Sequence, residues 1–374
     1  MIKNQGIMVN NIYQQIFNFI KNLFFIIIVS LFIFFIFKNP KIISKSVSQG
    51  LNLCVDIIIP SLFPFMVICS FIAVSPIMIV LSKIFKPVTK YIFNLPSDVG
   101  CLIFISFIGG YPIGAKAISE LLYKKEITEK IANRLLCFCV NAGPAFVITA
   151  IGYMMYGSKK IGCYLLISHI LGSIVIGSVL GLFNKDIDKK ERSEIYITPL
   201  KYSQAFVKAV VDSSFGIISI SSFVVIFSVI TVLIKNIFAN NEFVNILLSF
   251  LEITVGMKNV INLDGILSIL LCSFLISFSG FSVICQIFYF IKDYNLNKTR
   301  FLIFRIIHGF ISAGIIYLIL FFSKDTRYTS VVLYDKEIEF FNISPFLSSV
   351  ILLISFCFII FSYSEFFEEN KFLK

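Results

Sequence analysis

Long uninterrupted runs of apolar residues alternate with short polar connections along nearly the whole chain. An α-helix needs about 20 apolar residues to cross the roughly 30 Å of hydrocarbon in a bilayer. The pattern therefore predicts an all-α polytopic membrane protein with about 8–10 transmembrane helices, some of them broken or re-entrant. The apolar runs cover residues 23–37, 60–82, 99–115, 135–156, 161–183, 209–234, 265–291, 301–322 and 344–363, and two amphipathic pieces at 47–59 and 243–256 are candidate half-helices.

The chain also shows a weak internal repeat. An ungapped shift of 171 residues aligns "ISFIGGYPI" (105–113) with "ISFSGFSVI" (276–284) and pairs Arg134 with Arg305. About ten of roughly 39 aligned positions are identical, where biased composition alone gives roughly three or four. The repeat predicts two related halves, each with a broken helix, a basic connector and a polar-lined return helix.

Composition agrees with a membrane protein, since 58% of the 374 residues are hydrophobic and only 14% are charged. The formal net charge is +11, but the basic residues lie in short loops and form no basic domain. They are better explained as loops that set membrane topology than as a nucleic-acid surface, so we expect no nucleic acid partner. The loops 124–134, 185–208 and 292–305 are predicted to face the cytoplasm, and the more acidic loop 327–342 to face outward.

The sequence contains no pattern typical of an active site. Its nine cysteines lie almost entirely in apolar runs, where Cys behaves as a small hydrophobic residue, and it has only two histidines. It also lacks a phosphate-cradling loop and a nucleophile elbow. We therefore expect no enzymatic activity, no cofactor and no metal.

The predicted organisation has five segments. No small-x-small cleavage site follows the first apolar run, so we interpret it as a retained anchor and not as a signal peptide. The segments are an N-terminal anchor helix and loop (1–46), a first half (47–183), a basic cytoplasmic linker (184–208), a second half (209–322), and an outer loop with a C-terminal transmembrane helix (323–374).

The stretch "SFIGGYPIGAK" (106–116) is unusual inside an apolar run. Gly109 and Gly110 lower the helix propensity and Pro112 removes a backbone donor, so a helix is predicted to break here. Unpaired backbone groups are tolerated in hydrocarbon only beside a cavity or other protein, and broken helices at matching places in two repeats indicate a transport site. The alternative is close helix packing through Gly110 and Gly114.

Several ionisable residues lie within or beside the apolar runs. Lys116 is costly in lipid, so it either serves a cavity as a compensating or coupling charge or extends to the cytoplasmic interface, and Glu120 is placed to pair with it on one helix face. Asp56 and Asp212 occupy equivalent places in a fainter sequence echo, as interfacial residues or as coupling carboxylates. Glu252, in "LEITVG" (251–256), is a candidate re-entrant tip.

A second break is predicted at "NAGPAF" (141–146), where Asn141 offers an amide and Gly143-Pro144 interrupts the helix. The alternative is a proline kink beside a hydrogen-bonded Asn. In the second half, the stretch 276–284, which aligns with the first break at 105–113, contains small and polar residues. The predicted solute-binding residues are Gly109, Gly110, Tyr111, Pro112, Gly114, Lys116, Asn141, Gly143, Pro144, Ser279, Gly280, Ser282 and Gln286.

Three further expectations concern single residues. Pro60 and Pro64, in "IPSLFPF", are expected to break a helix. Arg134 and Arg305 are expected to be cytoplasmic anchors. His308 is expected to be a helix-packing residue in preference to a proton relay.

A family resemblance rests on four stretches that occur in order between residues 51 and 317. They are "PSLFPFMV", "GGYPIGAKAISELLYKKEITEKIANRLLCFCVNAGPAFVI", "LEITVG" and "SFSGFSVICQI". Together they resemble the sporulation integral membrane protein YlbJ family of endospore-forming bacteria. That family carries the nucleoside recognition or Gate domain, whose name reflects similarity to gating segments of nucleoside and ferrous iron transporters and does not identify a substrate.

The resemblance implies a multi-pass protein of the mother-cell or outer forespore membrane that is needed for spore cortex formation, with each half similar to a Gate segment. We expect a transporter or channel-like protein for a small polar solute. The alternative is a non-transporting membrane scaffold that recruits cortex-assembly proteins through the loops 124–134 and 185–208. Expected partners are the lipid bilayer, a small polar solute or ion, and further copies of the chain or other sporulation membrane proteins.

Overall fold

The computed structural model describes residues 2–183, 199–238, 242–261, 263 and 265–323. This part of the chain is almost entirely helical and contains no β-strand. Six helical stretches in it are long and apolar enough to cross a membrane, which confirms an all-α polytopic membrane protein. These stretches are Gln14–Lys38, Pro40–Val74, Lys159–Phe183, Tyr202–Asn236, Gly265–Phe290 and Lys298–Ser323.

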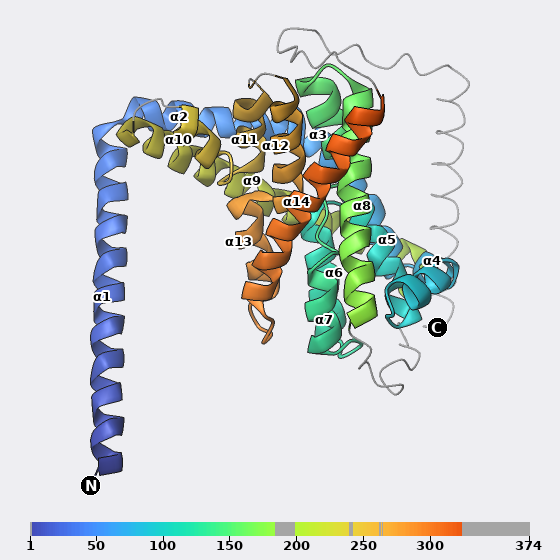
Figure 1. Ribbon diagram of the computed structural model, residues 1–374, viewed down its shortest axis with the longest axis horizontal. Coiled ribbons are helices and arrows are strands. Elements are labelled where there is room, and N and C mark those ends of the chain that lie inside the picture. Colours follow the sequence, from blue (N-terminus) through green and yellow to red (C-terminus); the bar gives the residue numbers. More distant parts are fainter. Residues whose placement is uncertain (1, 184–198, 239–241, 262, 264, 324–374) are drawn as a thin grey trace, which may run out of the picture.

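The helices follow one another in two groups (Figure 1). The first group is α1 (Ile2–Lys38), α2 (Pro40–Leu53), the π-helical turn η1 (Cys54–Ile58), α3 (Ile59–Val74), α4 (Ile77–Pro87), η2 (Val88–Ile92), η3 (Ser97–Val99), α5 (Gly100–Ile108), α6 (Tyr111–Tyr123), α7 (Glu129–Leu136), the π-helix η4 (Ala145–Met155) and α8 (Lys159–Phe183). The second group is α9 (Tyr202–Phe238), α10 (Glu242–Leu248), α11 (Ile253–Ile261), α12 (Gly265–Phe278), α13 (Gly280–Phe290) and α14 (Lys298–Ser323).

Helix α1 stands apart from the other helices (Figure 1). None of its most apolar stretch is buried inside the protein, and its packing contacts are with α2. A helix that is hydrophobic on all sides and unburied by protein is expected to lie in lipid.

Four of the predicted runs are split into shorter helices, and two of them, 60–82 and 265–291, become α3 with α4 and α12 with α13. The run 99–115 becomes α5 and α6, which are separated at Gly109 and Gly110, and the run 135–156 becomes α7 and η4 with an unwound segment between them. The amphipathic piece 243–256 likewise becomes α10 and the start of α11, separated at 249–252. Irregular backbone therefore occurs several times within apolar sequence.

The expectation that Pro60 and Pro64 break a helix is wrong. Helix α3 contains both prolines and continues directly from η1. Pro60 lies in the first turn of α3, and the Ser61 hydroxyl donates to the Ile57 carbonyl at 2.6 Å. The π-helical turn shifts the hydrogen-bond register before Pro60, and the chain runs helically from Pro40 to Val74.

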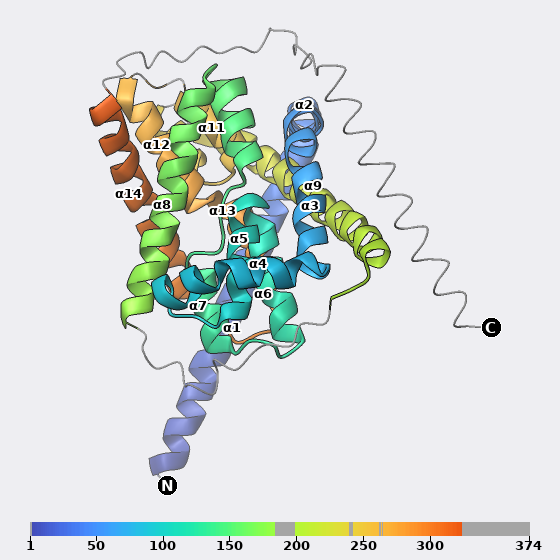
Figure 2. The same ribbon diagram turned by 90° about the vertical axis from the view of Figure 1, so that its right-hand side faces the viewer.

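Helices from both ends of the chain share one core. Helix α8 packs against η4 and α14, while α12 packs against α14, and the main apolar cluster joins residues of α6 and α8 to residues of α11, α12 and α13. On another side, α2 and α3 pack along α9 (Figure 2). The two sequence halves are therefore in direct contact through buried side chains.

Parts of the predicted organisation lie outside the described residues. These parts are most of the linker 184–208 and nearly all of the segment 323–374, including the loop 327–342 and the apolar run 344–363. The predicted boundary at residue 46 falls inside α2. The two related halves and their internal repeat stay predictions.

Candidate functional site

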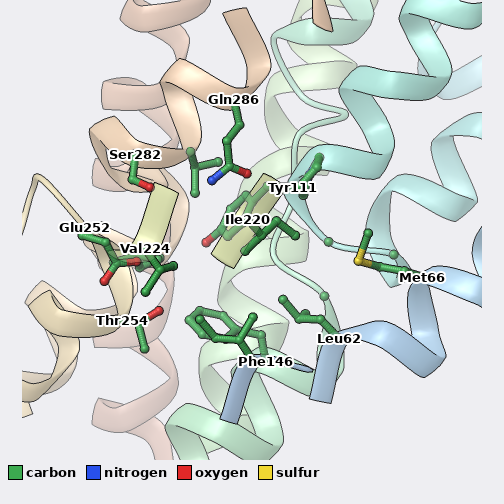
Figure 3. Close-up of a pocket in the computed structure, with 17 residues that line it drawn as sticks. Leu62, Met66, Tyr111, Phe146, Ile220, Val224, Glu252, Thr254, Ser282 and Gln286 are labelled. Atoms are coloured by element: carbon green, nitrogen blue, oxygen red, sulfur yellow. The ribbon is translucent and has the colours of Figure 1, made fainter. Parts of the chain in front are cut away.

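Four helix starts surround a cavity near the middle of the protein (Figure 3). Helices α6, η4, α11 and α13 begin there, each after a short irregular segment. Because the first N–H groups of a helix have no partner within the helix, each start contributes partial positive charge. Glu252, Thr254 and Ser282 lie on one side of the cavity, and the apolar Leu62 and Phe146 lie on another (Figure 3).

The start of α6 crosses the segment that precedes η4. Gly110 has a φ of +89°, a conformation open to glycine, and Pro112 lies in the first turn of the helix. A Cβ atom on Gly143 would lie 2.8 Å from the Ile108 carbonyl oxygen and 3.2 Å from the Gly110 nitrogen. The two backbones therefore approach too closely for any side chain at Gly143.

The start of α13 crosses the segment that precedes α11 in a different manner. The N–H groups of Phe281 and Ser282 donate to the carbonyls of Phe250 and Leu251, both at 2.8 Å. The adjoining Ser279 and Gly280 have φ values of +76° and +74°. Two main-chain hydrogen bonds thus join the second pair of segments.

Glu252 immediately precedes α11 and is only 2% exposed. Its carboxylate accepts a hydrogen bond from the Val255 N–H at 2.7 Å, as in a helix N-cap. The Ser282 hydroxyl, on the same side of the cavity, is 1% exposed and has no hydrogen-bond partner among the described residues. Buried polar atoms without partners are uncommon, and here they face a space that water or a solute can enter.

The cavity is nearly closed in this structure. The space open to the centres of water-sized molecules is about 40 Å³, which is room for two or three waters. Its walls combine residues of α3, α6, α9, η4, α11 and α13. The site is therefore formed between the two sequence halves.

Seven of the thirteen predicted binding residues line this cavity. They are Gly109, Gly110, Tyr111, Pro112, Gly143, Ser282 and Gln286. The other six do not line it. They are Gly114, Lys116, Asn141, Pro144, Ser279 and Gly280.

Two of these six residues hold the unwound segment 137–143. A Cβ atom on Gly114 would lie 1.9 Å from the Cys139 carbonyl oxygen, so α6 packs directly on the segment. The Asn141 amide donates to the Phe138 carbonyl at 2.8 Å, while its own carbonyl oxygen is buried and has no partner in the described part of the chain. Asn141 therefore shapes the segment and does not line the cavity.

Lys116 lies outside the cavity, in a cluster of charges between α6 and α9. Its ammonium group is 3.4 Å from the Asp212 carboxylate and 4.0 Å from that of Glu120. Lys208 also binds Asp212, at 2.8 Å. Because these side chains are 23–42% exposed, the cluster has access to solvent or headgroups, and the carboxylates already balance Lys116.

The expectation that Arg134 and Arg305 are cytoplasmic anchors is wrong, because they are 3% and 0% exposed. Arg134 donates to the carbonyls of Phe93 and Asn94, the latter at 3.1 Å. Arg305 donates to the Val140 carbonyl at 2.5 Å and to the Cys137 carbonyl at 3.3 Å. Each guanidinium satisfies carbonyls that an irregular segment exposes where water is absent.

A histidine pair supports the same segment from α8 and α14. The Ala142 N–H donates to His169 Nε2 at 3.0 Å, so the other ring nitrogen carries the proton and donates to Ser277 at 2.8 Å. The rings of His169 and His308 are stacked with centroids 4.7 Å apart, and His308 Nε2 donates to the His169 carbonyl at 2.9 Å. His308 is packed between helices, as expected.

Sequence reasoning gave Glu252 no place among the binding residues and did not consider Thr254, although both line the cavity. The available signal was a carboxylate inside a short amphipathic piece, "LEITVG", which marked Glu252 as a candidate re-entrant tip. Only the packing of α11 against the other helix starts brings this residue to the cavity. Within the described residues, no group of three His, Cys, Asp or Glu side chains is placed to hold a metal ion.

One curated protein is similar along most of the chain. The sporulation integral membrane protein YlbJ of Bacillus subtilis (strain 168) is 22% identical over 335 residues, which cover 79% of this chain and 82% of that protein. This similarity supports the assignment to the YlbJ family, which the sequence motifs resemble. No protein-family model and no solved structure matches, so the Gate domain stays a prediction. The membrane-spanning helices and this similarity support a multi-pass sporulation membrane protein.

Proposed function

We propose that this chain is a transporter or channel-like protein that carries a small polar solute through the cavity between its two halves. One observation carries the proposal: four helices begin around a single cavity inside an otherwise apolar membrane protein. Discontinuous helices whose ends meet inside a membrane protein are typical of transporter binding sites. Irregular backbone of this kind is tolerated where it lines a cavity.

The chemistry of the cavity favours a solute with a negatively charged or strongly hydrogen-bond-accepting group. The helix starts direct partial positive charge toward the space. The N–H groups of Gly110 and Gly143 have no hydrogen-bond partner among the described residues, and neither has the Ser282 hydroxyl. The Gln286 amide adds further donors on the same wall.

The small size of the cavity supports an alternating-access mechanism. Binding pockets for small organic molecules usually measure about 300–1,000 Å³, far more than the present space. The walls must therefore separate before a solute enters. The half-helices α6 and α13 are suited to such movement, because each starts at a glycine-containing break where the backbone leaves the helical conformation.

The biological setting of the proposal comes from the family. We place the transporter in the mother-cell or outer forespore membrane and its solute in spore cortex formation. The similarity to a sporulation membrane protein of Bacillus subtilis supports the sporulation part of this assignment. The resemblance of the motifs to the YlbJ family supports the cortex part.

Cysteine accessibility tests the proposal. In a full-length variant without native cysteines, Ser282→Cys is expected to react with a membrane-impermeant methanethiosulfonate reagent. The matched control is Ser273→Cys, since Ser273 is equally buried at 1% exposed but lies away from the cavity and bonds to Ser168. Reaction at position 282 alone supports a water-filled pathway.

Uptake by proteoliposomes then addresses the solute. A panel of radiolabelled organic acids, amino acids, nucleosides and sugars is tested for uptake and for protection of Ser282→Cys. The absence of labelling at position 282, in a protein that still supports cortex formation, contradicts the proposal and favours the membrane scaffold. In that case neutralising the basic loop 124–134 is expected to abolish function instead.

A further inference from the structure

Glu252 is the one carboxylate among the residues that line the cavity. It is 2% exposed, and no basic side chain lines the cavity or forms an ion pair with it in the described part of the chain. Its carboxylate accepts hydrogen bonds from the Val255 and Thr254 N–H groups and from the Thr254 hydroxyl, all in the first turn of α11. A buried carboxylate in these surroundings needs an explanation beyond helix capping, because burying an unpaired charge is costly.

The ionisable groups around Glu252 do not neutralise it. Tyr111 of α6 uses its hydroxyl to donate to the Ile276 carbonyl at 2.6 Å. Cys54 of η1 is buried and uncharged as a thiol. Lys258 lies six residues further along α11, about 9 Å along the helix axis. The cavity residues from α3, α9, η4 and α13 are uncharged.

Two opposing effects act on this carboxyl group. Burial without a cation favours the protonated form, whereas the α11 start and the Val255 N–H favour the ionised form. The balance therefore depends on what else occupies the cavity. In an empty cavity the surrounding helix starts favour the ionised form and burial favours the protonated form, so both forms of Glu252 are populated.

A solute with an anionic group changes this balance. Two negative charges a few ångströms apart repel strongly in a site with little water, so the entering anion favours protonation of the carboxylate. Entry of the anionic group therefore shifts Glu252 further toward its protonated form.

We propose that Glu252 is a proton-binding site that couples solute movement to protons. The carboxylate takes one proton from the side on which the anionic group enters, forming an O–H bond, and releases that proton on the side on which the anion leaves. Solute and proton thus move in the same direction. This inference rests on the proposed transport function.

The protonation state can be probed directly with dicyclohexylcarbodiimide, which reacts with protonated carboxyl groups in apolar surroundings. The full-length protein in proteoliposomes is treated between pH about 5 and about 8, and labelled peptides are measured by mass spectrometry. Burial keeps part of Glu252 protonated even without solute, so we expect it to be labelled about tenfold more than Glu120, a partly exposed carboxylate beside Lys116. Labelling is expected to fall as the pH rises and to disappear in Glu252→Gln.

Coupling to movement needs a second measurement. The rate at which the impermeant thiol reagent reaches Ser282→Cys is followed over the same pH range in two backgrounds. The titration of the thiol itself affects the reaction rate equally in both variants, so the comparison cancels it. Beyond this effect, we expect the rate to depend on pH in the matched variant Glu120→Gln and not in Glu252→Gln. Because Gln can still accept from the Val255 N–H, the α11 start is retained.

The outcomes separate this inference from the proposed function. If Ser282→Cys reacts but Glu252 is never labelled, or if both variants show the same pH dependence, then coupling through Glu252 is overturned and the solute pathway stands. If Ser282→Cys does not react at any pH, both are overturned. If Glu252→Gln fails to fold, carbodiimide labelling of the unsubstituted carboxyl still decides its protonation.

Discussion

The two places where a broken helix crosses an unwound segment are built differently. At the first crossing, α6 meets the segment before η4 through direct contact of Gly110 and Gly143, and the N–H groups of these glycines have no partner among the described residues. At the second crossing, α13 donates two hydrogen bonds to the segment before α11, and that segment ends in Glu252. The first crossing thus offers free donors, and the second presents an ionisable acceptor.

From this difference we infer that the two crossings have different roles in the proposed transport. A site with unused N–H groups is suited to hold an anionic group, because it has no charge of its own that must be neutralised. A site with a buried carboxylate is suited to exchange protons. Variants that affect only one crossing can separate these roles.

The largest effect is expected from Arg305→Leu, which removes the donor that holds the first crossing. The carbonyls of Cys137 and Val140 would be left buried without their charged donor, so we expect a loss of about 3 kcal/mol in the free energy of unfolding. Thermal unfolding of the purified protein in detergent measures this loss. Lys298→Leu on the same helix, at an exposed position, is the control and should change the free energy by less than about 0.5 kcal/mol.

Gly143→Ala is expected to have the next largest effect. The new Cβ atom would lie 2.8 Å from the Ile108 carbonyl oxygen, and overpacking of this kind costs about 2 kcal/mol. The control is Gly314→Ala, at the aligned position of the second half, where a Cβ atom meets nothing within 4 Å. If the two variants unfold at the same temperature and label equally at Ser282→Cys, close backbone contact is not what defines the first crossing.

Tyr111→Phe tests a tie between the two halves. It removes the hydroxyl that donates to the Ile276 carbonyl at 2.6 Å, and a loss of about 1 kcal/mol is expected in thermal unfolding. Tyr123→Phe, 82% exposed on the same helix, should leave the unfolding temperature unchanged. An equal response from both variants would argue against a specific tie between α6 and α12.

The smallest effect is expected from Lys116→Ala. Its ion pairs with Asp212 and Glu120 are partly exposed, so we expect a loss of about 0.5 kcal/mol that diminishes with added salt. Uptake by proteoliposomes gives the second readout, and we expect it to be retained. Loss of uptake in a stable Lys116→Ala protein would place a charge of the first half on the solute pathway. It would contradict the inference that the first half contributes only uncharged donors.

The class of protein and several of its helix breaks could be predicted from the sequence. Long apolar runs predict membrane-spanning helices, and the break at Gly109 and Gly110 follows from local properties of glycine and of the nearby Pro112. The motifs that resemble the YlbJ family could also be recognised without a structure, because each consists of consecutive residues. Pro60 and Pro64 show the limit of such local rules, since the helix continues through both prolines after a π-helical turn.

Only the tertiary structure decided which polar residues meet. Lys116 and Glu252 both looked like unusual ionisable residues in apolar sequence, yet the first joins a partly exposed charge cluster and the second lines the cavity. Arg305 appeared to be a loop anchor but is fully buried against carbonyls some 165 residues away. The physical reason is that helix breaking depends on nearest neighbours, whereas burial and charge pairing depend on how distant helices pack together.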